Sequence, residues 1–171
     1  MNKRLPSISP DLSKAIFAQF PELKKVNEVD PHSMSRVAVS VFDHWLHDES
    51  EWHLFDCFSG PERKARDEKF LAHWSAIYDY TNVYTVRSRG RWSVKSKLVL
   101  KRFLDKPFYM QKSKILMHLS PNQFIVLPEF DCIYAASWDD TNVLFFNDGA
   151  KAEPILQLAK NVGLHILEFD D

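Results

Sequence analysis

Glycine and cysteine are both scarce in this chain of 171 residues. The four glycines are Gly60, Gly90, Gly149 and Gly163. They lie too far apart to form the GxGxxG or Walker A loops that bind nucleotide phosphates. The two cysteines, Cys57 and Cys132, belong to no CxxC motif, which excludes a zinc ribbon and a disulfide framework. We therefore expect a protein of a reducing compartment that lacks these nucleotide-binding loops.

Long hydrophobic runs are missing as well. The basic N-terminus, residues 1–10, is not followed by the run of about 7–15 apolar residues that a secretory signal contains. No stretch approaches the roughly 20 apolar residues of a membrane-spanning helix. The sequence thus predicts a cytoplasmic protein that does not bind a membrane.

The overall composition is that of an ordinary globular domain, with 45% apolar and 26% charged residues. A chain of this length buries on the order of 70% of its unfolded surface when it folds, which is enough to form a core without a metal or a disulfide. We expect residues 1–171 to form a single domain without a cofactor.

The formal net charge of −1 conceals blocks of opposite sign. Residues 26–59 carry one basic and seven acidic residues, and residues 115–171 carry two basic and nine acidic residues. Residues 81–114 carry ten basic residues and one acidic residue. Such blocks either pair with one another inside the fold or bind charged partners.

The spacing of apolar residues predicts three helices in the first half of the chain, over residues 10–20, 30–46 and 61–78. Pro10 and Pro31 stand in the first turns of two of them, where proline is well tolerated. Asp30 is a suitable N-cap for the second helix, and Pro21 follows the end of the first. Between the second and third helices, the apolar residues 52–58 predict a buried strand.

From residue 82 onward the apolar period changes toward two, which is typical of strands. Strands are predicted over residues 83–88, 124–127, 131–136, 142–146 and 164–169, with a turn over 88–91. Residues 97–104 fit either a strand or a helix. A late helix over 152–162 ends at Gly163. This order predicts an α+β fold: a mainly antiparallel sheet with N-terminal helices packed against it and a late helix before the last strand.

Histidines and carboxylates are densest over residues 43–53, which include His44, His47 and His53. Divalent transition metals bind these types of side chain, so a metal-dependent hydrolase is one alternative. Neither an HExxH motif nor a third ligand at a diagnostic spacing accompanies them. We favour a solvated helix face that holds no metal.

No motif of nucleophilic catalysis is present. A GxSxG elbow is absent, and both Cys57 and Cys132 lie in predicted apolar strands, where a buried thiol is inert. We therefore expect a protein that is not an enzyme.

The basic segment 87–114 alternates cations with aromatic rings. Its rings are Trp92, Phe103, Phe108 and Tyr109, and its cations include Arg89 and Arg91. Cations that neutralise phosphates, next to rings that stack on bases, are typical of single-stranded nucleic-acid binding, so an RNA-binding module is a second alternative. Because the core needs several of these rings, we favour a solvated or internally paired face and expect no direct nucleic-acid binding.

Acidic and aromatic residues gather in two predicted turns of the C-terminal part. They are Glu129, Asp131, Trp138, Asp139 and Asp140. Tryptophan is enriched among the residues that dominate binding energy, and carboxylates match a basic partner surface, so these five are candidate partner-binding residues. The alternative is that Trp138 folds back over the sheet and the two aspartates serve only the turn.

The C-terminal part resembles a bacterial family of immunity proteins that are encoded beside polymorphic or contact-dependent growth-inhibition toxins. The resemblance rests on residues 126–134, the Asp139–Asp140 turn, and residues 143–146, 155–159 and 163–167. It implies a cytoplasmic protein without a reaction of its own that binds the C-terminal domain of one cognate toxin and blocks its active site or substrate surface. Many such toxins are nucleases, including nucleases that cleave transfer RNA. The resemblance supplies no catalytic residues.

Overall fold

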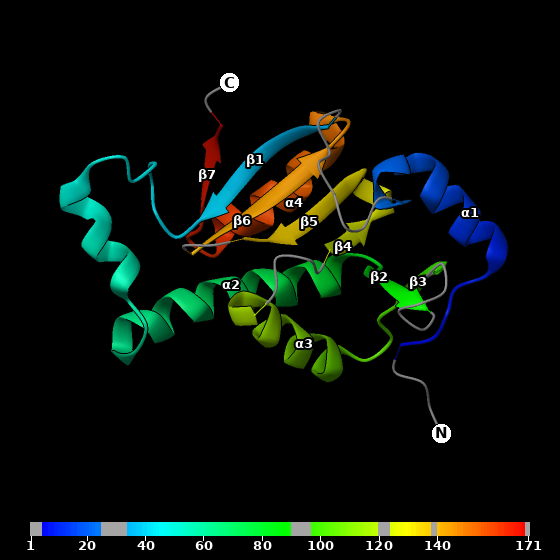
Figure 1. Cartoon of the computed structure of the whole chain (residues 1–171), viewed down its shortest axis with the longest axis horizontal. Helices are drawn as coiled ribbons and strands as arrows, with labels where there is room; N and C mark the ends of the chain where they lie inside the picture. Colours follow the sequence, from blue (N-terminus) through cyan, green and yellow to red (C-terminus); the bar gives the residue numbers. More distant parts are fainter. Residues whose placement is uncertain (1–4, 25–33, 90–96, 120–123, 138–139, 170–171) are drawn as a thin grey trace.

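The computed structural model describes residues 5–24, 34–89, 97–119, 124–137 and 140–169. Within these ranges, seven strands form one antiparallel sheet in the order β3-β2-β4-β5-β6-β1-β7 (Figure 1). The strands are β1 Ser35–Ser40, β2 Tyr84–Arg89, β3 Lys97–Arg102, β4 Phe124–Leu127, β5 Cys132–Ala136, β6 Thr141–Phe146 and β7 His165–Glu168.

Four α-helices and three short 3-10 helices complete the described part of the chain. The α-helices are α1 Pro10–Gln19, α2 Gly60–Tyr80, α3 Lys106–Leu119 and α4 Gly149–Asn161. The 3-10 helices are η1 Pro21–Lys24, η2 Glu49–Asp56 and η3 Pro128–Phe130. Side chains cap α1 and α4, where Ser9 accepts from the Leu12 amide and Asp148 accepts from the Ala150 amide. These elements form the α+β fold that the sequence predicts.

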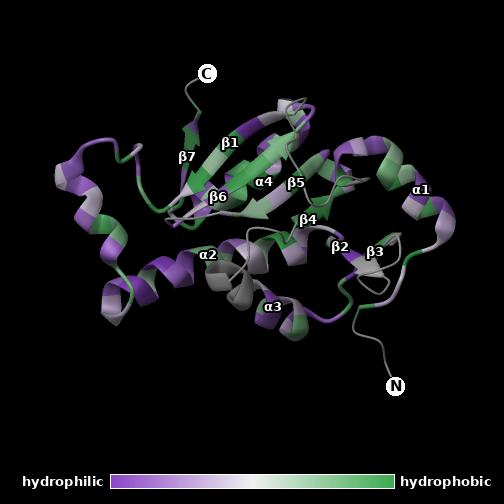
Figure 2. Ribbon diagram, viewed as in Figure 1, coloured by the Kyte–Doolittle hydropathy of each residue, from purple (hydrophilic) through white to green (hydrophobic). Residues whose placement is uncertain are grey.

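The larger core lies between the sheet and helices α2, α3 and α4. Phe70, Trp74 and Ile77 of α2 pack against Tyr134 and Leu144 of the sheet. Figure 2 shows the strands β4, β5 and β6 as largely hydrophobic, whereas the first half of α2 is mostly hydrophilic. The apolar second half of α2 therefore packs on the sheet. Its charged first half makes polar contacts with other parts of the chain.

A smaller core covers the opposite face of the sheet. Ile16 of α1 and Phe20, the residue after α1, pack there with Leu23 of η1 and with Ile133 and Ala135 of β5. Alternate residues of β5 thus enter the two cores, and all five of its residues are buried. The two faces therefore explain the unbroken apolar run of this strand.

The predicted helix over residues 30–46 is wrong. Residues 35–40 form β1, which lies between β6 and β7, and Asp30 and Pro31 are outside the described residues. Val37 and Val39 pack into the larger core, while Ala38 and Ser40 are buried as well. The second half of β1 is covered on both faces of the sheet, so residues 37–39 are apolar without alternation, and such a run also satisfies helical spacing.

Two further elements differ from their predictions. Residues 49–56 form the 3-10 helix η2 rather than part of a strand, because Asp48 caps its first turn by accepting from the Ser50 amide at 2.8 Å. Helix α3 was not predicted, although Asp105 caps it by accepting from the Phe108 amide at 2.7 Å.

The ambiguous segment 97–104 forms β3 over its first six residues. The predicted turn over 88–91 lies partly outside the described residues.

Candidate functional site

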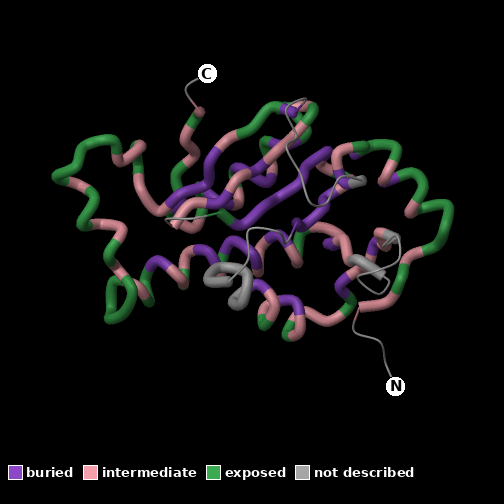
Figure 3. The backbone as a smooth tube through the Cα atoms, viewed as in Figure 1, coloured by how far each residue is buried: buried purple, intermediate pink, exposed green. Residues whose placement is uncertain are grey.

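Residues 42–58, which connect β1 to α2, project from one end of the sheet (Figure 1). We call this segment the arm. It contains five carboxylates and no lysine or arginine: Asp43, Asp48, Glu49, Glu51 and Asp56. None of its residues is buried, and Figure 3 shows it as exposed and intermediate throughout. The arm therefore presents an acidic surface to solvent.

Two large aromatic side chains of the arm are exposed. Trp52 is 51% exposed and Phe58 is 81% exposed. A single exposed apolar residue is ordinary, but two aromatic rings on one projecting segment are typical of a surface that binds another macromolecule. Tryptophan in particular is enriched among residues that dominate binding energy.

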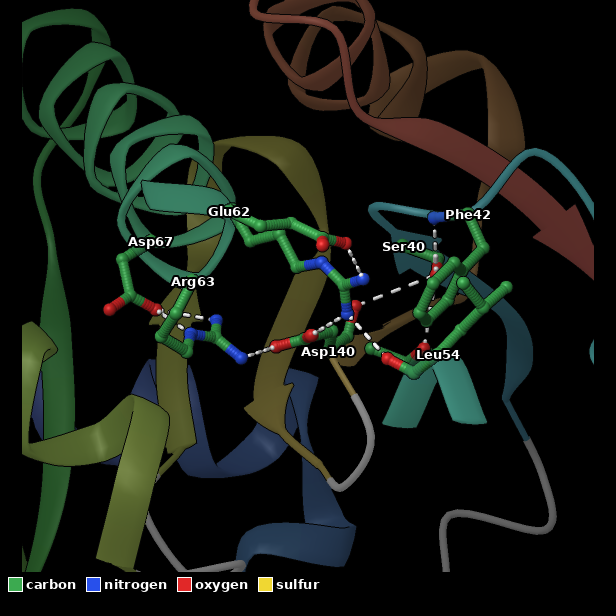
Figure 4. A network of polar contacts seen from close by, with 9 residues as sticks. Ser40, Phe42, Leu54, Glu62, Arg63, Asp67 and Asp140 are labelled. Carbon is green, nitrogen blue, oxygen red and sulfur yellow. Dashed lines mark hydrogen bonds and ion pairs between the residues drawn. The ribbon is translucent and has the colours of Figure 1, made fainter. Parts of the chain in front are cut away.

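A network of ion pairs attaches the arm to the rest of the fold (Figure 4). Arg66 of α2 donates to the Leu54 carbonyl of the arm and to the Asp140 carboxylate, both at 2.8 Å. Arg63 donates to the other oxygen of Asp140 and to Asp67. Asp140 thus receives two guanidinium groups from α2 at the turn between β5 and β6. The network joins the arm, α2 and the sheet at one point.

The network lies mostly out of solvent. The side chains of Arg66, Asp140 and Arg63 are only 9%, 11% and 17% exposed. Burial lowers the pKa of both arginines, but the contacts of each arginine with two carboxylates together outweigh that effect, so each pKa is raised. The second carboxylate is Asp67 for Arg63 and Glu62 for Arg66. Both guanidinium groups are therefore charged, and Asp140 is the carboxylate that they share.

His44 joins two parts of the arm. Its Nδ1 lies 2.6 Å from the Asp43 carboxylate, and its Nε2 lies 2.7 Å from the Glu51 carboxylate in η2. The hydrogen bonds to Glu51 and then to Asp43 raise the pKa of His44 above 6.5. A carboxylate at each ring nitrogen favours the imidazolium, which can donate to both. His44 therefore acts as a cationic link and has no free nitrogen to act as a base.

A pocket of about 350 Å³ opens at the base of the arm. Its lining is mainly apolar and aromatic: Ser40, Phe42, His44, Trp45, Leu46, His47, Phe55, Ser137, Thr141, Val143, Leu167 and Phe169. The residues come from the arm, from the ends of β1 and β5, and from β6 and β7. The pocket therefore lies where the arm meets the sheet.

The residues predicted for a metal-dependent hydrolase do not form a metal site. His44 is bound to two carboxylates, and Nδ1 of His53 lies 2.7 Å from the Ser50 carbonyl. Among the described residues, no group of three or more histidine, cysteine or acidic side chains is arranged to hold a metal ion.

Three of the five predicted partner-binding residues lie in the described part of the chain, and their carboxylates all have partners within the fold. Glu129 is exposed and accepts from Thr81 at 2.5 Å and from Asn82 at 3.0 Å. Asp131 is buried and accepts from Gln19 at 3.0 Å and from Asn147 at 3.2 Å.

Asp140 is the carboxylate of the arginine network. Asp131 and Asp140 therefore stabilise the fold and are not presented to a partner. Trp138 and Asp139 lie outside the described residues.

Two of the four rings in the basic segment 87–114 are not available for base stacking. Phe103 and Tyr109 are buried in the larger core, and Trp92 lies outside the described residues. Lys106 forms an ion pair with Asp79 at 2.5 Å, and Lys101 donates to Ser7 at 2.7 Å. This part of the chain thus uses several of its rings and cations for its own packing.

Cys132 is a buried thiol at the end of β5 rather than a nucleophile. Burial raises its pKa to about 12, and its Sγ donates to the Phe130 carbonyl at 2.9 Å. Because a thiolate is the reactive form, Cys132 is inert at neutral pH.

Comparisons with protein-family models, curated proteins and solved structures find no match for this chain. No helix in the described ranges is both long enough and apolar enough to cross a lipid bilayer.

Proposed function

We propose that this protein is an immunity protein that binds one cognate toxin domain through the arm and covers the toxin's working surface. The observation that carries the proposal is the exposure of Trp52 and Phe58 on a segment with five carboxylates and no lysine or arginine. The resemblance of residues 126–167 to immunity proteins supports the same function. The docking surface proposed here is the arm, because Asp131 and Asp140 are occupied within the fold.

The charge of the arm suits a basic partner. A nuclease must attract phosphate, so its active-site groove is lined with lysine and arginine. The arm carboxylates would compete with phosphate for that groove, and opposite charge would steer the two proteins together. We therefore expect association to slow as the salt concentration rises, because exposed charges are screened over about 8–10 Å at physiological ionic strength.

The two exposed rings would supply most of the affinity. A standard interface buries about 1,600 Å² in total, and a few central aromatic residues account for most of its binding energy. Nanomolar affinity corresponds to about −12 kcal/mol. Trp52 and Phe58 are the rings on the arm that are already exposed and that lose the most water contact when covered.

The test uses the C-terminal domain of the protein encoded by the adjacent upstream reading frame. We expect this domain to stop growth when expressed alone and to be harmless when this chain is present. The double variant Trp52→Ala, Phe58→Ala should bind the domain at least about 100-fold more weakly, a loss of about 2.7 kcal/mol. Isothermal titration calorimetry measures the affinity, and thermal unfolding shows that the variant is folded.

Leu104→Ala is the matched control, because Leu104 is 54% exposed and lies between β3 and α3, outside the arm. This variant should bind as the wild type does. An upstream domain that is harmless to unprotected cells would contradict the proposed function. Unchanged affinity of a folded arm variant would contradict the assignment of the docking surface.

A further inference from the structure

We propose that the pocket at the base of the arm receives one uncharged aromatic side chain of the partner protein. This inference rests on the proposed function, because the partner is the toxin domain that binds the arm. The pocket adjoins the proposed docking surface, and Trp45 and Phe55 of the arm form part of its wall. A ring inserted here would lie next to the residues that bind the basic surface of the partner.

The aromatic wall of the pocket is already positioned by contacts within the chain. Trp45 donates through Nε1 to the Glu168 carbonyl at 2.6 Å, and its ring lies 5.1 Å from that of Phe169. Phe42 and Phe55 meet edge to face at 6.0 Å. A partner ring would extend these pairs with the tilted and edge-to-face contacts that aromatic rings prefer. Little conformational entropy would be lost in the wall when the ring enters.

The charges around the pocket favour a neutral ring over a cation. The Arg66 guanidinium lies 5.0 Å from the centre of the Phe42 ring, and the Arg36 guanidinium lies 4.5 Å from that of Phe169. Two of the aromatic walls therefore already bind a cation of this chain. Carboxylates pair with the charged groups near the pocket: Arg66 contacts Asp140 and Glu62, and His44 lies between Asp43 and Glu51. A lysine or arginine of the partner would find Phe42 and Phe169 each already in contact with a cation of this chain, whereas an uncharged ring can pack against the edges of the lining rings.

The size of the pocket agrees with a single side chain. Its volume of about 350 Å³ lies at the lower end of the range of about 300–1,000 Å³ for ligand pockets. Its floor is formed by aliphatic groups of two strands, Val143 and Leu167. One aromatic residue, seated on this floor and enclosed by the arm, matches the buried central anchor of a protein interface.

The first experiment uses small probes and needs no toxin. N-acetyl-tryptophanamide and N-acetyl-lysinamide are titrated separately into the full chain, and the methyl NMR signals of Val143 and Leu167 are followed. We expect the tryptophan probe to shift both signals with saturation in the millimolar range and the lysine probe to leave them unchanged. No shift with the tryptophan probe, or equal shifts with both probes, would overturn the inference.

The second experiment fills the pocket. Val143→Trp places a ring on the floor, and Ser137→Trp places one from an exposed position at the rim, so a folding defect in the first does not prevent the test. Each variant should abolish the probe shift and weaken binding of the toxin domain at least about 10-fold, which is about 1.4 kcal/mol. Val99→Trp, at a half-buried position of β3 outside the pocket, should do neither.

The two proposals fail in different ways. If the probes do not bind, or if the filled variants bind the toxin domain as tightly as the wild type, the pocket inference is wrong and the immunity function stands. If the upstream domain is harmless to unprotected cells, the proposed function is wrong. The inference that a side chain of this toxin domain enters the pocket is then wrong as well.

Discussion

Asp131 and Asp140 adopt the same left-handed backbone conformation, with φ of 54° at each, but their carboxylates have different partners. Asp131 accepts from two neutral amides, those of Gln19 and Asn147. Asp140 accepts from the guanidinium groups of Arg63 and Arg66. Aspartate and asparagine both tolerate this conformation, so replacing each aspartate with asparagine changes the charge without changing the backbone preference.

We expect Asp140→Asn to lower the free energy of unfolding by about 2 kcal/mol, because it removes one of the two carboxylates that each arginine contacts and leaves Arg63 with Asp67 and Arg66 with Glu62. Asp131→Asn should cost less, about 1 kcal/mol, because an amide oxygen still accepts from the neighbouring amides. Urea denaturation of the two variants and the wild type measures the difference. Equal losses would show that the arginine network contributes no more than the amide contacts do.

At the scale of elements, none of the arm's residues is buried, and contacts at its base hold it to the fold. They are the arginine network at Leu54 and the hydrogen bond and ring contact of Trp45 with residues 168 and 169. His44 links Asp43 to Glu51 within the arm, and this link depends on the charge of the His44 ring. Elements that bury few side chains open at low free-energy cost, so the part of the arm beyond the contacts at its base can adapt to a partner.

The pKa of His44 is raised in the folded protein, so its link contributes stability at low pH and loses it as the pH rises through that value. A neutral imidazole has one N–H and can donate to only one of the two carboxylates. We expect the His44 ring signals to titrate above pH 6.5 in proton NMR, and Glu51→Gln to move that pKa down toward 6.5. A His44 pKa that Glu51→Gln does not change would argue against the link.

The elements differ in how far their sequences predict them. Helix α1 begins at Pro10 as predicted, and α4 ends within one residue of its predicted end before Gly163, although it begins three residues earlier than predicted. Residues 37–39 of β1 do not alternate between polar and apolar side chains, because this part of the strand is covered on both faces of the sheet, and they were therefore assigned to a helix. The exposed position of the arm was not predicted. Trp52 and Phe58 are apolar, and an apolar run indicates a buried strand when exposure is not known. The sequence feature that indicates an exposed segment is the cluster of carboxylates over 42–58, which contains no lysine or arginine.

The candidate site was less predictable than the fold. The role of Arg63 and Arg66 depends on Asp140, which lies more than 70 residues further along the chain. Nothing in the local sequence distinguishes an arginine that binds such a partner from one on a solvated helix face. The pocket likewise combines residues from β1, the arm, β6 and β7, so only the tertiary structure brings its walls together.

At the scale of the whole molecule, a neutral histidine lies in the larger core. His73 of α2 is fully buried, with Nε2 3.3 Å from the Ile155 carbonyl and Nδ1 3.4 Å from the Tyr134 hydroxyl. The carbonyl can only accept, so Nε2 donates to it and Nδ1 accepts from Tyr134. Burial lowers the pKa of His73 to about 4, so the ring is uncharged at neutral pH.

This histidine makes the whole fold sensitive to acid. The unfolded chain takes up a proton at His73 near pH 6.5 and the folded protein only near pH 4, so the unfolded state gains stability as the pH falls between these values. The loss of folding free energy is about 3 kcal/mol over that range. His73→Gln should be less stable at pH 7 but should lose about 3 kcal/mol less than the wild type between pH 7 and pH 4. Urea denaturation at several pH values measures both, and parallel curves would contradict the assignment.

The position of β1 in the sheet affects how the chain folds during synthesis. β1 pairs with β6 and β7, which emerge from the ribosome about 100 residues or more after it. At the usual rate of about 5–20 residues per second, β1 waits on the order of 5–20 s without either neighbour. The nascent chain therefore carries β1 without either neighbour until β6 and β7 are released, and it is exposed to aggregation during this interval.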